Sequence, residues 1–598
     1  MSICTIVPFR RSVIPGILFL MFLFDVQAFS QHINSVQSGI PVVSSFTPMS
    51  GPVGTIVTIT GSNFSATKED NIVWFGGVKV AVTNASDASL TITVPPGSIS
   101  SSISVTVGGI TGVSSRMFDV TFGTGGDISA GSFDNSATFS TGVQGRGIAA
   151  GDLDGDGKVD IVVADDGAKT ISVLHNSSTK GTVSFDDKVD FAAGDRPSSV
   201  ALADFDGDGL LDIVCANLEN GNIGVYRNTS TPGTITSGSF ASRKIFTTGN
   251  NPWDIAVGDL DGDGLIDIAV VCQLSSAVTV LRNKSTAGVI SFDVMKEFAA
   301  ESIPQGVAIG DIDGDGKLDI AIGNNGSGSV SVFHNTSTAG SITTASFDSA
   351  VNFSTDSPRG IALRDLNGDG KPELIAGGTN YMTVFPNTAT SGSITTGSFG
   401  TKKLNAAGSL VQCAVVGDYN GDGLPDLASA NYNGNSVSVV QNLSTTGALN
   451  FSGPLTIAAN KQPRYAATGD FNNDGKPDIA VVNYANPGTI TILQNTFSSS
   501  TAVQSRQEIL REFSLSQNYP NPFNPTTTLA FTLLKDGITT LKIYNVLGQE
   551  VATLVNEALK AGEYHKAVFN ATNFASGIYI ARLQSGNQVQ LKKMLLLK

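Results

Sequence analysis

The chain contains 598 residues with a formal net charge of −15 at pH 7, and 15% of its residues are charged. One hydrophobic core seldom serves a chain of this length, so we expect several domains. The negative charge argues against nucleic acid or an anionic membrane as a partner.

The N-terminal residues have the pattern of a secretory signal peptide. Arg10 and Arg11 precede an apolar stretch at residues 14–24, and a small-residue cleavage pattern ends at Ala28. The apolar stretch is short for a membrane span. We therefore predict a signal peptide over residues 1–28, cleaved near Ala28, and an exported protein.

Residues 41–121 alternate apolar and polar positions between clusters of glycine, proline and asparagine. That pattern predicts an immunoglobulin-like β-sandwich, with Trp74 in its core. The stretches PMSGPVGTIVTITGSNF at residues 48–64, VWFGG at residues 73–77 and VPPG at residues 94–97 resemble the IPT/TIG family. The resemblance implies a spacer or binding module, and no active site is transferred from it.

Residues 130–496 contain seven aspartate-rich loops, numbered 1 to 7 in chain order, at intervals of 52 to 55 residues. An apolar strand precedes each loop, a second follows it, a third ends at an asparagine, and another strand in the repeat begins with phenylalanine. Four short strands per repeat are typical of a β-propeller blade. We therefore predict an all-β chain with a seven-bladed β-propeller between the immunoglobulin-like sandwich and a small C-terminal sandwich. The recurrent asparagines are Asn176, Asn228, Asn283, Asn335, Asn387, Asn442 and Asn495.

The first phenylalanine strand, at residues 133–139, precedes loop 1, and no equivalent strand follows Asn495. A linear array would leave its last blade one strand short. A ring can recover that strand if residues 133–139 pair with the last blade, and closure also protects the sheet edges. We predict non-covalent closure of the ring in this way.

Each loop supplies side-chain oxygens at positions 1, 3, 5 and 9 and a backbone carbonyl at position 7. Calcium takes six to eight oxygen ligands in flexible geometry, whereas magnesium prefers tight octahedra with retained waters. We therefore predict up to seven structural calcium ions. The predicted ligands are Asp152, Asp154, Asp156, Lys158, Asp160, Asp204, Asp206, Asp208, Leu210, Asp212, Asp259, Asp261, Asp263, Leu265, Asp267, Asp311, Asp313, Asp315, Lys317, Asp319, Asp365, Asn367, Asp369, Lys371, Glu373, Asp418, Asn420, Asp422, Leu424, Asp426, Asp470, Asn472, Asp474, Lys476 and Asp478.

Loops 5 to 7 carry asparagine at position 3, so we expect weaker binding there. An EF-hand would need an acid at position 12, where loop 1 has Val163 in an expected strand. The strand–loop–strand context resembles the FG-GAP/VCBS repeats of integrin α-chain propellers, which implies ions clustered on one face of the ring. Ligation by protein groups alone leaves no position for a substrate, which favours structural over catalytic metal.

Residues 497–512 have the composition of a linker, and residues 513–598 show alternating strands and polar turns. The NYPNPFNP, YNVLGQEV and SGIYIARL segments and the KKMLLLK tail resemble the type A sorting domain of the type IX secretion system. The resemblance implies a Gram-negative bacterial protein, secreted or held at the outer-membrane surface. Its partner would be the outer-membrane secretion machinery, and the domain is often cleaved.

The chain contains no G-x-S-x-G elbow, H-E-x-x-H motif or phosphate-binding loop, so we predict no catalytic residues. His175 and His334 occupy one repeat position, just before the recurrent asparagine, and we interpret that position as surface variation. Trp253 is the one exposed aromatic candidate for ligand binding. Cys215 and Cys272 fall in apolar runs, where we expect buried free thiols.

Two functional classes remain. The favoured one is a calcium-binding surface protein for adhesion that engages an unidentified protein or glycan, without enzymatic activity. The alternative is a secreted polysaccharide-active lyase or hydrolase on a propeller scaffold. The small number of histidines, four in all, favours binding.

Overall fold

The structure is a computed structural model that describes residues 39–123, 125–498, 513–515, 518, 521, 523–533, 535–560 and 565–597. The predicted signal peptide and the predicted linker from residue 499 onward lie outside the described residues. The chain divides into two compact units, Met1–Ser499 and Ser500–Lys598. The regular elements are strands apart from two short 3-10 turns, so the predicted all-β class is confirmed. No helix within the described ranges is long and apolar enough to cross a membrane.

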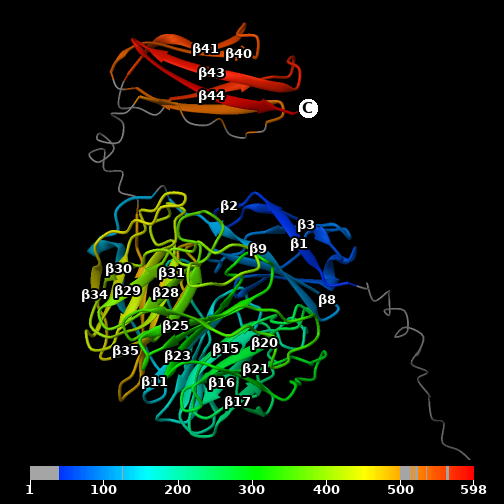
Figure 1. The fold of residues 1–598 in the computed structure, drawn as a ribbon, viewed down its shortest axis with the longest axis vertical. Coiled ribbons are helices and arrows are strands. Elements are labelled where there is room, and N and C mark those ends of the chain that lie inside the picture. Colours follow the sequence, from blue (N-terminus) through cyan, green and yellow to red (C-terminus); the bar gives the residue numbers. More distant parts are fainter. Residues whose placement is uncertain are drawn as a thin grey trace, which may run out of the picture. The chain divides into compact units, whose positions relative to one another are not determined.

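The first unit begins with a β-sandwich of two antiparallel sheets (Figure 1). One sheet contains β1 (Val42–Thr47), β3 (Ile56–Ser62), β7 (Ser89–Thr93) and β6 (Asn84–Ala85), in that order. The other contains β2 (Ser50–Gly51), β9 (Ile110–Val120), β8 (Ser101–Val107), β4 (Asn71–Phe75) and β5 (Val78–Val80), with β2 joined in parallel. The 3-10 turn η1 (Lys68–Asp70) precedes β4.

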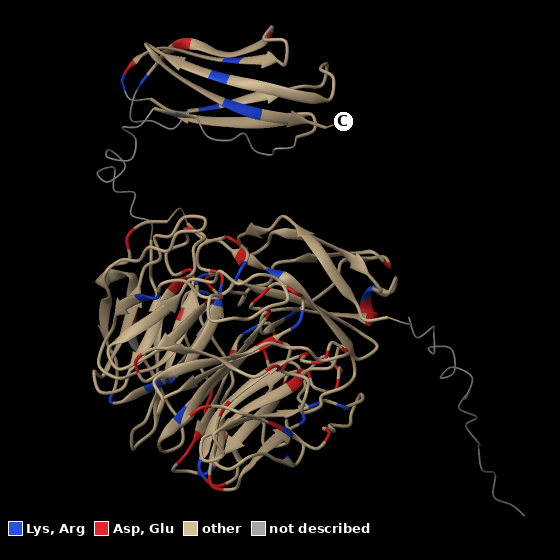
Figure 2. Ribbon diagram, in the orientation of Figure 1, with Lys and Arg blue, Asp and Glu red and all other residues tan. Residues whose placement is uncertain are grey.

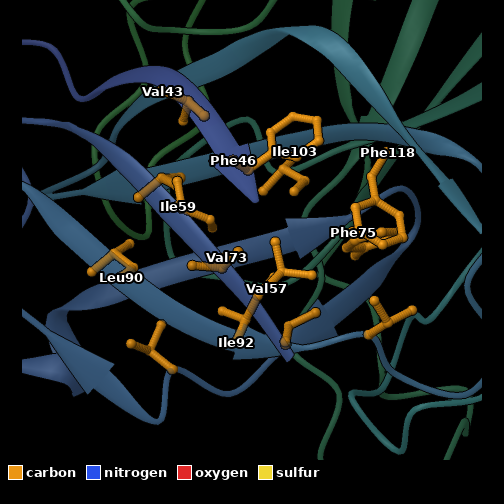
Figure 3. Packing of buried hydrophobic residues seen from close by; sticks show 14 of the residues in the cluster. Val43, Phe46, Val57, Ile59, Val73, Phe75, Leu90, Ile92, Ile103 and Phe118 are labelled. Atoms are coloured by element: carbon orange, nitrogen blue, oxygen red, sulfur yellow. The ribbon is translucent and has the colours of Figure 1, made fainter. Parts of the chain in front are cut away.

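Alternating apolar residues of both sheets fill the core of this sandwich. Val57, Ile59 and Val73 are fully buried between the sheets, as Figure 3 shows. The Phe75 and Phe118 rings meet edge to face at 5.1 Å. Alternation of inward apolar and outward polar positions is what a two-sheet core requires, and it produced the sequence prediction of a sandwich here.

Residues 133–495 form seven four-stranded antiparallel sheets in the described part of the chain. The first three contain β11 (Gly145–Gly151), β12 (Asp160–Asp165), β13 (Thr170–Leu174) and β14 (Val189–Ala192); β15 (Pro197–Ala203), β16 (Asp212–Asn217), β17 (Asn222–Tyr226) and β18 (Lys244–Thr247); and β19 (Pro252–Gly258), β20 (Asp267–Cys272), β21 (Ala277–Leu281) and β22 (Lys296–Ala299). The next three contain β23 (Pro304–Gly310), β24 (Asp319–Asn324), β25 (Ser329–Phe333) and β26 (Val351–Ser354); β27 (Ile361–Arg364), β28 (Glu373–Gly377), β29 (Tyr381–Phe385) and β30 (Lys403–Ala406); and β31 (Val411–Gly417), β32 (Asp426–Asn431), β33 (Ser436–Val440) and β34 (Leu455–Ala458).

The seventh sheet joins the two ends of the repeat region. It contains β35 (Pro463–Gly469), β36 (Asp478–Asn483), β37 (Thr489–Asn495) and, as its outer strand, β10 (Phe133–Ser140), which follows the turn η2 (Ala130–Ser132). β10 pairs antiparallel with β37 from Phe133 opposite Asn495 to Ser140 opposite Thr489. The predicted pairing of residues 133–139 with the last repeat is therefore confirmed.

The first strands of neighbouring sheets contact one another in a closed cycle, in the order β11, β15, β19, β23, β27, β31, β35 and back to β11. We call these seven strands the inner strands. The second strand of each sheet is buried at every residue, as in β12 and β20. Burial on both faces is expected when each sheet packs between two others, as around the axis of a propeller.

The second unit is a small sandwich of its own. Its three-stranded sheet contains β38 (Ser514–Leu515), β39 (Thr526–Thr532) and β42 (His565–Asn570). Its four-stranded sheet contains β41 (Glu550–Leu559), β40 (Gly537–Asn545), β43 (Gly577–Ser585) and β44 (Gln588–Leu596). Leu529, Phe531, Leu541 and Met594 are among the residues buried between the sheets.

Candidate metal-binding loops

The seven acidic loops each join an inner strand to the second strand of its sheet. In loop 1 the backbone amides of Gly155 and Gly157 donate to Asp152 at 2.8 and 3.1 Å, which wraps the chain around the first acid. The glycine at position 6 has φ between 84° and 91° in all seven loops, a conformation that favours glycine. Figure 2 shows acidic residues in the loops of the repeat region, whereas its strands are mostly uncharged.

The acid at position 9 ties each loop to the third strand of its sheet. In loop 3, Asp267 accepts hydrogen bonds from the backbone amides of Leu260 at 2.9 Å and Asn283 at 2.7 Å. Equivalent bonds recur in the other six loops, with Glu373 as the acceptor in loop 5. A carboxylate has about four lone-pair sites, so these bonds leave room for a cation.

The recurrent asparagines connect neighbouring sheets, a role that the sequence analysis did not assign. Asn283 Nδ2 donates to the carbonyl of Ile266 in loop 3 of its own repeat and to that of Phe205 in loop 2 of the preceding repeat, both at 2.9 Å. The series closes where Asn176 donates at 3.1 Å to the carbonyl of Phe471 in the last sheet. The recurrence of this asparagine 14 to 17 residues after the position 9 acid of its loop was the signal that could have revealed the link.

The acids of loops 1 to 4 gather closely enough to hold a cation. One carboxylate oxygen from each of Asp204, Asp206 and Asp208 lies within 4.8 Å of the others, and Asp152, Asp154 and Asp160 form an equivalent group. Oδ2 of Asp154 and Oδ2 of Asp313 are buried without a hydrogen-bond partner. Buried carboxylate oxygens are costly unless a positive charge approaches them, and His175 and His334, which lie near these two oxygens, supply one only when protonated. The carboxylate donor set therefore also fits a hard divalent cation.

The electrostatics of the loops agree with this fit. Burial, reinforced by neighbouring acids, raises the pKa of Asp152 to about 6 and the pKa of Asp204 to about 7. The position 9 acids shift in the same direction, because burial raises the pKa of Asp267 to about 8 and of Asp319 to about 7. A bound cation would reverse these shifts by stabilising the ionised form.

In loops 5 to 7 the position 3 amides are held by hydrogen bonds. Asn367 Nδ2 donates to Glu373 at 2.9 Å, and Asn420 Nδ2 donates to the carbonyl of Gly126 at 2.8 Å. Oδ1 of Asn472 accepts from the Asp474 amide at 3.0 Å. Asn367 and Asn472 are thus bonded within their own loops, whereas Asn420 is bonded to the segment that precedes β10.

The residue before each recurrent asparagine is not simple surface variation, and this corrects our interpretation of His175 and His334. Nε2 of His175 lies 3.2 Å from Oδ2 of Asp154, and Nε2 of His334 lies 3.4 Å from Oδ2 of Asp313. In loop 2, Arg227 at the same position forms ion pairs with Asp206 and Asp208, the acids at loop positions 3 and 5, at 2.7 Å each.

The type of residue at this position varies with the number of acids in its loop. Loops 1 to 4 have aspartate at position 3 and a basic residue before the asparagine, whereas loops 5 to 7 have asparagine at position 3 and Pro386, Gln441 and Gln494 there. Burial lowers the pKa of His334, but the hydrogen bond to Asp348 and the charges of Asp319 and Asp313 outweigh it and raise the pKa overall. The extra carboxylate of loops 1 to 4 therefore faces a basic side chain within the protein itself.

The N-terminal sandwich covers several of the loops. The amide of Asp152 donates to the carbonyl of Gly77 at 2.8 Å, and Lys79 Nζ donates to the carbonyl of Gly209 in loop 2 at 3.0 Å. A Cβ atom added to Gly207 would lie 2.4 Å from the Cα of Gly109, so the two backbones meet where only glycine fits. The loop-bearing face of the ring is thus partly occupied by another part of the same unit.

Two tryptophan predictions need correction. Trp74 is buried, but it packs with Leu153 and Leu211 of the ring and not within the sandwich core. Trp253 is partly buried, because the guanidinium carbon of Arg146 lies 4.4 Å from its ring centre. The sequence could not reveal either contact, since each joins segments far apart in the chain.

The predicted free thiols are confirmed. Cys215 and Cys272 are buried and unpaired, and so is Cys413. Burial raises the pKa of Cys272 to about 11, which makes its thiolate a poor candidate nucleophile.

Family models match three regions of the chain. An IPT/TIG domain matches residues 41–122, and a secretion system C-terminal sorting domain matches residues 517–597. The FG-GAP-like repeat matches five times, at residues 152–215, 204–270, 259–322, 311–376 and 418–481.

Individual proteins show weaker similarity. Mouse cartilage acidic protein 1 is 27% identical over 273 residues, which is 39% of this chain, and the chain spans 40% of the length of that relative. An auxiliary nutrient binding protein from Bacteroides thetaiotaomicron aligns over 76% of this chain and 98% of its own, at 11% identity and a TM-score of 0.29. An Agrocybe aegerita lectin that recognises terminal N-acetylglucosamine aligns over 72% of this chain and 100% of its own, at 16% identity and a TM-score of 0.38.

The three family matches follow the order of the folded parts. The sorting domain implies interaction with the type IX secretion machinery and export to the cell surface or the extracellular space. The chain is therefore a secreted or surface-exposed, β-propeller-like protein that combines an IPT/TIG domain, FG-GAP-like repeats and a secretion-system C-terminal sorting domain.

Proposed function

We propose that this protein is a calcium-stabilised binding protein of the bacterial surface, which engages a protein or glycan in adhesion and is not an enzyme. The observation that carries the proposal is the way each acidic loop closes around its first and last acids. Their acids are held by backbone amides, and the N-terminal sandwich covers part of the loop face. Enclosed metal sites are typical of structural ions, whereas catalytic sites keep an open position.

Calcium is the cation that best suits these loops. They offer carboxylate and carbonyl oxygens, the ligand type that calcium prefers, in a turn that can adjust to its size. The acids at positions 1, 3, 5 and 9 would hold the ion, and the ion would supply the positive charge that lets them ionise together. Because the position 9 acid also binds the third strand, metal binding would stiffen the sheet behind each loop.

A calcium titration tests the structural part of this proposal. We expect the mature protein, freed of metal with a chelator, to bind several calcium ions by calorimetry and to melt at a higher temperature with calcium than without. The paired variants Asp263→Asn in loop 3 and Asp187→Asn at an exposed surface position distinguish the loss of a metal ligand from the loss of one negative charge. Loss of one site in the first and not in the second is expected; an unchanged melting temperature on adding calcium would contradict the proposal.

A screen against glycans and polysaccharides tests the binding part. We expect retention on a glycan or protein array without release of reducing ends or unsaturated sugars. Release of such products, abolished by one point substitution, would instead establish the polysaccharide-active enzyme that we set aside.

A further inference from the structure

Seven side chains form one layer at the end of the inner strands opposite the acidic loops. We call them the axial layer: Arg146, Ser198, Trp253, Gln305, Arg359, Gln412 and Arg464. Arg146 lies five residues before Gly151, where β11 ends and loop 1 begins. At about 3.3 Å per residue, the layer is roughly 17 Å from the loops along the strand.

The backbone builds this layer in the same way in each repeat. A non-glycine residue with positive φ precedes every member by two positions, as Gln462 (φ 56°) precedes Arg464 and Ile303 (φ 55°) precedes Gln305. For a β-branched residue such as Ile303 this conformation is a true outlier. Six members, Arg359 being the exception, then fall where the register of the inner strand shifts. Bulges of this kind re-aim side chains, and strain of this kind is concentrated at functional sites.

The layer converges on the axis of the ring. Trp253 belongs to β19, and the guanidinium carbons of Arg146 on β11 and Arg464 on β35 lie 4.4 and 5.7 Å from its ring centre. In the cycle of inner strands, β35 is separated from β19 by β11 and β15. Side chains of sheets three steps apart can approach this closely only across the centre of the ring.

The charge of the layer is positive and incompletely compensated. Asp166 pairs with Arg146 at 3.0 Å and also with Arg196 at 3.2 Å. No carboxylate among the described residues forms an ion pair with Arg464, and its Nε is buried without a hydrogen-bond partner. The Arg464 guanidinium instead lies between aromatic rings, 5.1 Å from the centre of Tyr484.

Other acids near the layer are already engaged. Asp254, which follows Trp253, accepts two hydrogen bonds. One comes from Ser199 Oγ at 2.8 Å and the other from the backbone amide of Val307, on the next inner strand, at 3.3 Å. Burial, together with the neighbouring Arg464, lowers the pKa of Arg146 to about 10, and the pKa of Arg359 shifts in the same direction for the same reasons. The positive charge of Arg464 therefore repels those of Arg146 and Arg359, and an incoming anion would reduce this repulsion.

Neutral polar groups complete the layer. Gln305 is partly exposed, Gln412 is 8% exposed, and neither side-chain amide makes a hydrogen bond within the described residues. Unpaired amides in one layer with guanidinium groups offer donors and acceptors for hydroxyls and a fork for a carboxylate. These are the complementary groups of a compact, hydroxylated ring that carries an acid.

We propose that the axial layer binds an acidic saccharide, with the carboxylate of a uronic acid residue held by Arg464 and Arg359 at the end of the ring opposite the metal loops. The inference rests on the proposed binding function and names the ligand class for it. Gln305 and Gln412 would hydrogen-bond the sugar hydroxyls. Planar guanidinium groups suit this task because they bind a carboxylate through two parallel hydrogen bonds.

Titration calorimetry with the calcium-loaded mature protein tests the proposal. The probes are trigalacturonate, a neutral galactose trisaccharide and the peptide triglutamate. We expect trigalacturonate alone to bind, with an affinity that falls as salt is raised. Arg464→Gln should weaken binding about tenfold or more, because a charge-assisted contact at a partly desolvated site is lost. Lys461→Gln, which removes one exposed charge three residues away, should change it by less than about twofold.

Each other result overturns the proposal. Four results would do so: trigalacturonate does not bind, the neutral trisaccharide binds equally well, triglutamate binds equally well or more tightly, or Arg464→Gln binds trigalacturonate with unchanged affinity. An unchanged melting temperature of Arg464→Gln in calcium shows that a loss of binding is not a loss of fold. If trigalacturonate fails while the array screen finds another ligand, the axial assignment falls and the proposed binding function stands.

Discussion

At the scale of single residues, the recurrent asparagines do more for the ring than their neutral character suggests. Each one donates from a single amide to two carbonyls in the acidic loops of neighbouring repeats. Each also accepts a third bond from the backbone two residues ahead, as Asn283 does from Ser285 at 2.8 Å. All seven are buried. Because no other side chain offers two donors and an acceptor in so short a reach, substitution leaves buried backbone groups unpaired.

We therefore expect Asn283→Ala to lower the free energy of unfolding by about 2–4 kcal/mol, since three buried polar groups lose their partner. Urea unfolding of the calcium-loaded protein, followed by fluorescence, measures the change. Asn433→Ala, at an exposed turn position, is the matched control and should have little effect. Equal effects of the two substitutions would show that the inter-sheet bonds are energetically unimportant.

The acids of the loops predict an unusual pH dependence in the absence of metal. The folded-state pKa is about 6 for Asp259 and about 7 for Asp204, both raised by burial, against about 3.9 in an unfolded chain. The metal-free folded state thus holds more protons than the unfolded state between these values. The contribution of these two acids to the stability of the metal-free protein is therefore fully present below pH 4 and is lost as the pH rises through 6 to 7.

We expect the melting temperature of chelator-treated protein to fall between pH 5 and pH 8, and that of calcium-loaded protein to rise or stay level, because calcium binds the ionised acids. Scanning fluorimetry over this pH range at constant ionic strength measures both curves. A metal-free curve that rises with pH would mean that the loop carboxyls ionise freely without a cation.

At the scale of elements, the four-strand repeat could be predicted from the sequence because every boundary has a local signal. Apolar runs flank each loop, and the asparagine and phenylalanine of each repeat meet in one β-bridge, as Asn283 and Phe292 do. The outer strand of the last sheet could be predicted because the first phenylalanine strand precedes loop 1 and no equivalent strand follows Asn495. The bulges of the inner strands could not be predicted, because the residues at the bulges, such as Arg146 and Gln412, differ in type from repeat to repeat.

The pairing of β10 with β37 makes closure of the ring testable. Phe133 is buried against Tyr419, with ring centres 5.8 Å apart, so the strand brings core area as well as hydrogen bonds. We expect deletion of residues 130–142 to lower the melting temperature by about 10 °C or more, because the last sheet loses its edge strand. Phe133→Ala should give a smaller decrease and Ser140→Ala, at an exposed position, almost none. An unchanged melting temperature after the deletion would contradict closure by this strand.

At the scale of the whole molecule, the sequence predicted the order of domains but not how the N-terminal sandwich meets the ring. The prediction of a sandwich depended on alternation within strands, which says where a core lies and nothing about a second buried surface. Trp74 shows the consequence, because burial of a tryptophan on a predicted strand has the same sequence signal in a core and in an interface. Val78 behaves likewise, packing with Val159 of loop 1 and Ile161 of β12.

This interface predicts a coupling between the sandwich and loops 1 to 3. Trp74→Ala should remove the large side chain that fills the space between Leu153 and Leu211, at a cost of about 3–5 kcal/mol in the free energy of docking. The amide of Asp152 donates to Gly77 and that of Thr111 donates to Gly264, both at 2.8 Å, so these hydrogen bonds should then open more often.

Hydrogen exchange with mass spectrometry on the calcium-loaded protein measures this opening peptide by peptide. We expect Trp74→Ala to speed exchange in peptides that contain residues 110–113 and 150–156, and to leave the core strand β3 protected. Met117→Ala, at a side chain that is 38% exposed, is the control and should leave all three regions unchanged. Faster exchange throughout the sandwich would place Trp74 in its folding core after all, whereas unchanged exchange in the loop peptides would show that the sandwich does not hold the loop face of the ring.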